Sequence, residues 1–117
     1  MTGSFLRFYI HEGDRHHGKL LWEWLLMRAN ELGIHGGSAF KAAAGFGRHH
    51  KFSEDKFFEL AGSLAIEVEF IVSGEEAQQI LNLIHQENIS LFYACIPAHF
   101  GTIDLESPHP PSIKAGE

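Results

Sequence analysis

Residues 64–96 carry the sequence LAIEVEFIVSGEEAQQILNLIHQENISLFYACI, which contains a strand, a helix and a second strand in that order. In its first nine residues, apolar side chains alternate with others, as in a half-buried strand: Ile66, Val68, Phe70 and Val72. Ser73 and Glu76 have the spacing of a capping box, which predicts a helix that begins here and runs to about Glu87. The apolar run Leu91–Ile96 then predicts the returning strand.

The first half of the chain repeats this order with different residues. Phe5–Ile10 alternates like a strand. A helix is predicted over Leu20–Leu32, with one apolar stripe made of Trp22, Leu25, Leu26, Ala29 and Leu32. Gly33 followed by Ile34 is typical of a helix stop, and Ser38–Ala44 predicts a further strand. The complete order is βαββαβ, so the predicted fold class is α+β: a ferredoxin-like antiparallel sheet with two helices on one face.

Three segments are predicted to lie outside these elements. The polar stretch His11–Lys19 is expected to be a loop, and Arg48–Phe58 is expected to be a long, exposed and mobile one. Residues 104–117 contain three prolines and little apolar material, which predicts a flexible C-terminal tail after a single domain spanning residues 1–103.

The composition narrows the class of protein. A formal net charge of −6 argues against a nucleic-acid partner, because binding to phosphates requires a clustered basic surface. The single cysteine, Cys95, cannot form an internal disulfide, and its apolar surroundings in the sequence predict a buried thiol. The sequence contains no apolar stretch near the ~20 residues of a membrane span and no signal-peptide pattern at its start. These features predict a cytoplasmic protein.

The face of the predicted sheet without helices is expected to carry aromatic residues beside charged ones: Phe5, Tyr9, Tyr93, Arg7, Glu67 and Glu69. A cross-strand ion pair with Arg7 explains the two glutamates better than a pair of catalytic carboxylates. Exposed aromatic residues and free strand edges favour self-association. The sequence has no Walker loop, no Gly-x-Ser-x-Gly and no nucleophile with a recognisable base, so we expect no enzyme activity.

Two glycine-containing segments give the chain a family resemblance: Gly33-Ile34-His35-Gly36-Gly37-Ser38 and Gly45-Phe46-Gly47-Arg48. Together with the order of elements, they resemble the stretch that leads into the long flexible loop of PII signal-transduction proteins. The similarity extends from Leu6 to about Ile103 and is closest to the PII-like branch called domain of unknown function 190.

The resemblance implies a homotrimer that needs no cofactor for chemistry and binds an adenine nucleotide between subunits. It also implies signalling through the 48–58 loop to a partner protein. For this branch the resemblance points to a membrane transporter or another regulated protein as the partner, since its genes are often found beside fluoride-exporter genes. The nucleotide-binding residues that the resemblance implies are Gly36, Ser38, Gly45, Gly47 and, for a phosphate, Arg48. True PII proteins have a lysine-containing phosphate loop where this chain has Gln86–Ser90 without a cation, so AMP or ADP is expected rather than ATP.

Two alternatives remain open. One is a metal-binding trimer that uses the loop histidines His16, His17, His49 and His50. The sequence favours solvated loop residues instead, because adjacent histidines are expected to point in divergent directions and no Cys/His spacing typical of zinc is present. The other alternative is a structural trimer that binds no ligand.

Overall fold

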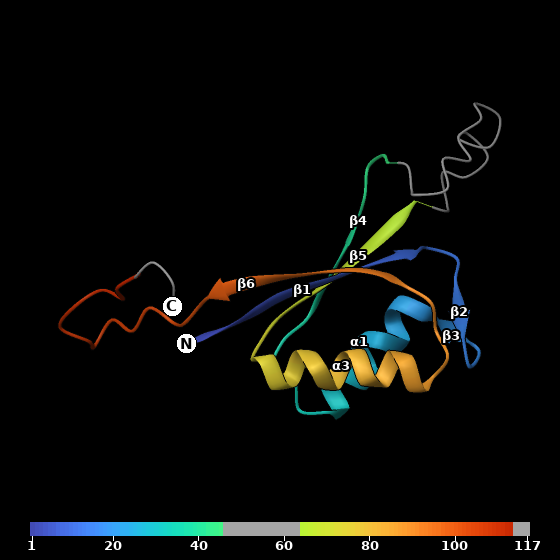
Figure 1. Ribbon diagram of the computed structural model, residues 1–117. Coiled ribbons are helices and arrows are strands. Elements are labelled where there is room, and N and C mark those ends of the chain that lie inside the picture. Colours follow the sequence, from blue (N-terminus) through green and yellow to red (C-terminus); the bar gives the residue numbers. More distant parts are fainter. Residues whose placement is uncertain (46–63, 114–117) are drawn as a thin grey trace.

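The computed structural model describes residues 1–45 and 64–113 and contains a four-stranded antiparallel sheet with both helices on one face (Figure 1). The strands stand in the order β4-β5-β1-β6, with these bounds: β1 Thr2–His11, β4 Ser38–Lys41, β5 Ala65–Val72 and β6 Phe92–His99. The helices are α1 (Leu21–Glu31) and α3 (Gly74–Gln86). The predicted βαββαβ order and ferredoxin-like fold are confirmed. Among the helices of the described ranges, none is long and apolar enough to cross a membrane.

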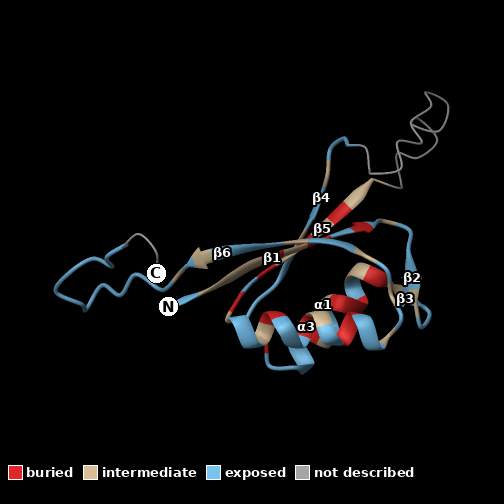
Figure 2. Ribbon diagram, in the orientation of Figure 1, coloured by how far each residue is buried: buried red, intermediate tan, exposed pale blue. Residues whose placement is uncertain are grey.

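The core lies between the helices and the inner face of the sheet (Figure 2). The alternation predicted for β1 is confirmed, because Leu6, Phe8 and Ile10 are at most 1% exposed. β5 contributes all four of its predicted inward residues: Ile66, Val68, Phe70 and Val72. The stripe on α1 is rotated from the predicted one, since the helix buries Leu21, Trp24, Leu25 and Ala29. Leu32, predicted to be on this stripe, caps the helix and is exposed.

Both helices end in the same backbone motif, a Schellman turn with a left-handed residue just after the cap. In α1 that residue is Gly33, with φ +87°, and the N–H of Ile34 donates to the carbonyl of Ala29 at 3.1 Å. In α3 it is Asn88, with φ 58°, and the N–H of Ile89 donates to the carbonyl of Ile84 at 3.2 Å. The predicted stop at Gly33 is therefore confirmed, and Asn88 plays the same part at the end of α3.

The capping box at the start of α3 is also confirmed. Ser73 Oγ accepts a hydrogen bond from the N–H of Glu76 at 3.1 Å, and Glu76 Oε1 accepts one from the N–H of Ser73 at 2.9 Å. This reciprocal pair satisfies two backbone donors that a helix start otherwise leaves unpaired.

The segment predicted as the loop His11–Lys19 contains a small hairpin instead. Its strands are β2 (Arg15–His16) and β3 (Lys19–Leu20), joined by His17 and Gly18. Both turn residues have positive φ, 50° and 78°, as in the type I′ turn that suits a two-residue hairpin. Arg15 Nη2 also donates to the carbonyl of Gly18 at 3.2 Å across the hairpin.

The last strand departs from the prediction in three ways. It continues past Ile96 to His99, because β6 is an edge strand and its outer side does not need the N–H that Pro97 lacks. Tyr93 pairs with Phe8 and so lies on the helix-bearing face of the sheet, not on the open face. Cys95 is exposed rather than buried, since it lies at the free margin of the sheet.

The loop between α1 and β4 contains two adjacent glycines with different surroundings. A Cβ atom on Gly37 would lie 2.6 Å from Cε1 of the buried Phe70 and 3.0 Å from Cδ2 of Leu26. A Cβ atom on Gly36 would meet nothing within 4 Å. Only Gly37 is therefore required by packing within the chain.

We expect Gly37→Ala to lower the free energy of unfolding by roughly 1–3 kcal/mol, because the added methyl group overpacks the core against Phe70. The measurement is urea unfolding at one fixed protein concentration. Gly36→Ala is the matched control and should stay within about 0.5 kcal/mol of wild type. Equal losses in the two variants would contradict the contact with Phe70 as the cause.

Candidate functional site

The described candidates for nucleotide binding lie around β4, the edge strand next to β5. Gly36 precedes the strand and Ser38 begins it, whereas Gly45 follows its last residue, Lys41. At ~3.3 Å per residue, the strand alone separates Ser38 from Lys41 by about 10 Å. The structure thus brings Gly36 and Ser38 together and places Gly45 at the other end. Gly47 and Arg48 lie outside the described residues, as does the predicted 48–58 loop.

Packing among the described residues, and backbone conformation, explain neither Gly36 nor Gly45. A Cβ atom at either position would meet open space, and neither has a φ in the left-handed region. A turn or a bulge therefore does not require glycine at these two positions. Close approach by a group outside the chain is a remaining reason for glycine there.

The end of β4 also carries a cation that the sequence analysis did not single out. Lys41 Nζ lies 2.9 Å from Glu12 Oε2, and the strand ends here, three residues before the predicted Ala44. The N–H of Ala42 still donates to the carbonyl of Ala65 at 2.9 Å, which joins the two chain segments on either side of residues 46–63. The sequence did not point to Lys41, because the predicted strand ran to Ala44 and placed Lys41 in its middle. The observed strand ends at Lys41.

The open face of the sheet is largely apolar and exposed. The cross-strand register places Phe5 beside Ile71 and Ile96, and Tyr9 beside Phe92. Ile71 and Ile96 are 52% and 50% exposed, and Phe40, Tyr9 and Phe92 are exposed as well. The rings of Tyr9 and Phe92 pack edge to face with their centroids 5.5 Å apart. Exposed apolar side chains gathered on one face are typical of a surface that another protein chain covers.

Arg7 occupies the middle of the open face. Its Nε lies 2.8 Å from Glu69 Oε2 and its Nη1 lies 3.5 Å from Glu67 Oε1, so the predicted cross-strand ion pairs are confirmed. A hydrogen bond with the side chain of Tyr9 and the charges of Glu69 and Glu67 raise the pKa of Arg7 above its ordinary value. The two glutamates are therefore partners of a guanidinium, which does not suit them to act as a catalytic acid and base.

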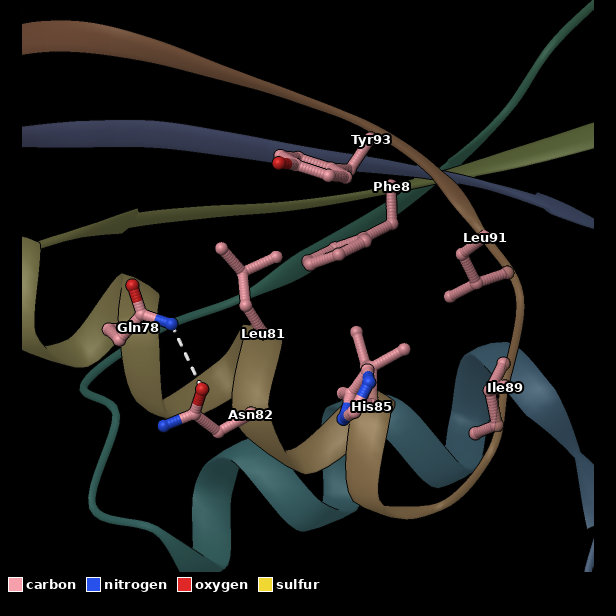
Figure 3. A pocket seen from close by; sticks show the side chains of 9 residues that line it. Phe8, Gln78, Leu81, Asn82, His85, Ile89, Leu91 and Tyr93 are labelled. Atoms are coloured by element: carbon pink, nitrogen blue, oxygen red, sulfur yellow. Dashed lines mark hydrogen bonds between the residues drawn. The ribbon is translucent and has the colours of Figure 1, made fainter.

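A shallow hollow of about 350 Å³ lies between α3 and β6 on the helix-bearing side (Figure 3). Phe8 and Tyr93 form one wall, while α3 and the connection after it form the other with these residues: Gln78, Leu81, Asn82, Ile84, His85, Ile89 and Leu91. In the plane of the sheet it lies at the β6 edge, opposite the glycines around β4.

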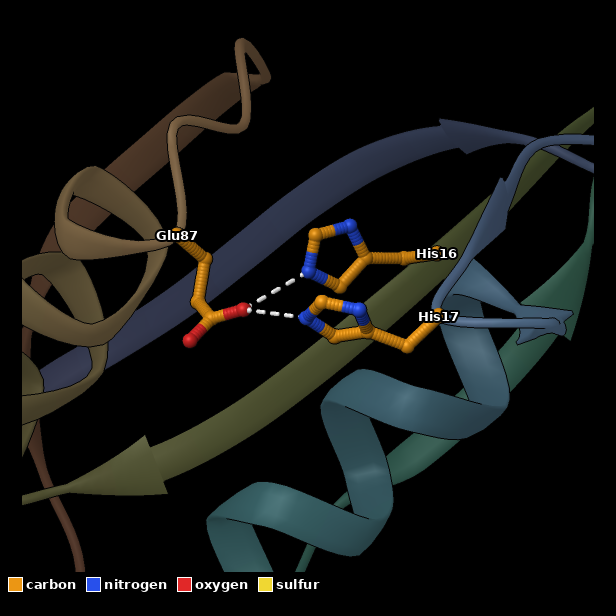
Figure 4. A group of neighbouring side chains, drawn as sticks. All are labelled: His16, His17 and Glu87. Atoms are coloured by element: carbon orange, nitrogen blue, oxygen red, sulfur yellow. Dashed lines mark hydrogen bonds and ion pairs between the residues drawn. The ribbon is translucent and has the colours of Figure 1, made fainter.

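A second group of candidates converges where the hairpin meets the end of α3. His16 Nε2 and His17 Nε2 lie 2.8 Å and 3.0 Å from the same atom, Glu87 Oε1 (Figure 4). The expectation that the two adjacent rings diverge is wrong, since their centroids are only 4.1 Å apart. Glu87 was not singled out as a ligand because it lies 71 residues from His16 in sequence. His49 and His50 are outside the described residues.

The two imidazoles also affect the carboxyl group they contact. Hydrogen bonds from His16 and then His17 hold the pKa of Glu87 below its usual range, so the group is ionised at neutral pH. The ring of His16 also packs edge to face against the ring of Trp24, with 4.5 Å between the centroids. The three side chains therefore present two nitrogens and one anionic oxygen at one point.

Comparison with known proteins shows which family the chain belongs to. The chain matches the family model DUF190, described as uncharacterized ACR, over residues 3–89. It is 32% identical over 98 residues to the UPF0166 protein of Aquifex aeolicus (strain VF5), covering 77% of this chain and 93% of that protein. Its fold is similar to that of a "putative PII-like signaling protein" from Thermus thermophilus, with a TM-score of 0.57 and 19% identity over 84% of this chain and 87% of that one. The family model spans most of the chain, and the protein therefore belongs to the DUF190 family and has a PII-like fold.

Proposed function

We propose that the protein is a PII-like regulatory ligand sensor. In this proposal it forms a homotrimer, binds AMP or ADP where subunits meet, and couples occupancy to the segment 48–58, which contacts a partner protein such as a membrane transporter. No bond chemistry is required of it. The observation that carries the proposal is the uncovered, apolar face of the sheet in a chain with a PII-like fold.

The open face supports the assembly step. Its exposed residues come from all four strands and surround an ion-paired centre at Arg7, so one continuous surface is available for another chain. Exposed apolar area of this kind is worth about 25 cal/mol per Å² when it is removed from water. A second and third copy of the same chain would supply matching apolar area without a different partner.

The position of β4 supports binding at a subunit boundary. β4 is an edge strand, so its outer side lacks a neighbour in the described part of the chain. Gly36, Ser38 and Gly45 flank that free edge, and the two glycines leave open space where a ligand could approach the backbone. A neighbouring subunit placed along this edge would close the space into a cleft.

We expect light scattering to give the mass of a trimer at micromolar concentration. Ile96→Lys should shift the protein toward monomers, because it places an unpaired charge in the apolar part of the proposed contact, beside Phe5. Ile113→Lys is the matched control, since Ile113 is exposed in the C-terminal segment outside the sheet, and it should leave the mass unchanged. A stable wild-type monomer would contradict the proposal.

We expect calorimetry to show that AMP or ADP binds more tightly than ATP. The proposed cleft has Arg48 as its designated phosphate partner, and the uncompensated charge of a triphosphate is costly to bury. Arg48→Ala should weaken binding by about ten- to a hundred-fold, equivalent to roughly 1.5–3 kcal/mol. Lys19→Ala, which removes an exposed cation on the β2–β3 hairpin, is the control and should bind like wild type.

Two outcomes of the calorimetry with AMP, ADP and ATP would differ from this expectation. Tightest binding by ATP would mean that a further cation reaches the phosphates, and Lys41 at the end of β4 is the described candidate. Absence of binding by all three nucleotides at millimolar concentration would contradict the sensor proposal in this form.

A further inference from the structure

His16, His17 and Glu87 bring three possible metal-ligand atoms close together. Two imidazole nitrogens approach one carboxylate oxygen at 2.8 and 3.0 Å, and all the possible ligand atoms lie within 4.8 Å of one another. Two ligands of a tetrahedral zinc ion, each about 2.0–2.2 Å from the metal, stand about 3.4 Å apart. Side-chain shifts well under 1 Å would open the two short contacts to that spacing.

Backbone conformation in the hairpin and at the end of α3 brings these three side chains together. His17 takes the left-handed conformation of the hairpin turn, which swings its ring to the side of His16 instead of the opposite one. Glu87 is the cap residue of α3, held in place because Asn88 adopts the left-handed position that ends the helix. Packing against Trp24 orients the ring of His16.

The donor set also selects the class of metal. Imidazole nitrogen suits Zn²⁺ and its transition-metal neighbours, whereas Mg²⁺ and Ca²⁺ prefer sets made of oxygen. Two neutral histidines and one carboxylate are the three protein ligands of a known type of zinc site, in which water takes the fourth position. His17 is 68% exposed on its side chain, which gives the ion and the water a path from solvent.

We propose that His16, His17 and Glu87 bind one divalent transition-metal ion per chain, of the class of Zn²⁺. The ion replaces the contacts between the histidines and the glutamate and ties the β2–β3 hairpin to the end of α3. This site is separate from the proposed nucleotide cleft, and it needs no residue from the segment 46–63.

The test is titration of the metal-stripped full chain with Zn²⁺, followed by calorimetry. The same titration is followed by fluorescence in a Trp22→Phe background, in which Trp24 is the one remaining tryptophan. We expect one ion per chain, a change in emission because the indole contacts His16, and no comparable binding of Mg²⁺. Loss of an outer-shell partner already costs 10–100-fold in affinity, so His16→Ala, His17→Ala and Glu87→Gln should each weaken binding by about 100-fold or more. Saturating Zn²⁺ should raise the Tm of the wild type by several degrees and leave that of Glu87→Gln nearly unchanged.

Two controls separate this site from the other histidines. His35→Ala removes an exposed loop histidine, and the pair His49→Ala/His50→Ala removes the other adjacent histidines of the sequence. Both variants should bind Zn²⁺ like wild type. His17→Ala is the variant least coupled to folding because of its exposure, and unfolding in EDTA checks that each variant is folded.

Three results would overturn the proposal. They are no stoichiometric binding of Zn²⁺, wild-type affinity in His17→Ala and Glu87→Gln, and loss of binding in His49→Ala/His50→Ala alone.

Discussion

Two helices can cover only one face of a four-stranded sheet, and most of this molecule follows from that limit. α1 and α3 use the inner face, where alternate residues of β1 and β5 are fully buried. The outer face carries exposed isoleucine and aromatic side chains around Arg7 and its two glutamates. Because these charges are paired within the chain, covering them costs less than covering a lone charge, although a desolvated ion pair adds little affinity. The outer face therefore combines an apolar driving force with a polar centre that is already satisfied by its own partners.

Most of the fold could be predicted because its signals are local. The alternation in β1 and β5, the capping box at Ser73 and the stop at Gly33 each involve residues within a few positions of one another, and all are confirmed. The prediction for the last strand was wrong about the positions of its side chains, because both faces of this strand are apolar. Tyr93 and Cys95 cannot be assigned to a face by alternation, and only the pairing of β6 with β1 places them. The short hairpin was missed because β2 and β3 have two residues each, too few for a period to appear.

The candidate sites were less predictable, for a related reason. The glycines around β4 were found through a family resemblance. The structure adds that, among the described residues, Gly37 has a packing role whereas Gly36 and Gly45 have none. The histidine pair was named but its geometry was misjudged, because a left-handed φ at His17 reverses the usual alternation. Glu87 could not be found at all without the contact between the hairpin and the end of α3. Turn conformation and long-range contact are the two kinds of information that residue spacing does not contain.

The proposed metal ion would change the charge of the connection that follows α3. The connection Gln86–Ser90 contains no lysine or arginine, and its one charged side chain is Glu87, which makes it unfavourable to a phosphate. A divalent ion held by Glu87, His16 and His17 would add two positive charges to this connection. Salt would weaken the effect of these charges on a distant nucleotide, since screening reduces electrostatic interactions beyond about 8–10 Å. Any such coupling must also be reciprocal. If bound metal raises the affinity for the nucleotide by some factor, bound nucleotide must raise the affinity for the metal by the same factor. The two sites can therefore be independent or mutually reinforcing, but an effect in one direction alone would be inconsistent with equilibrium binding.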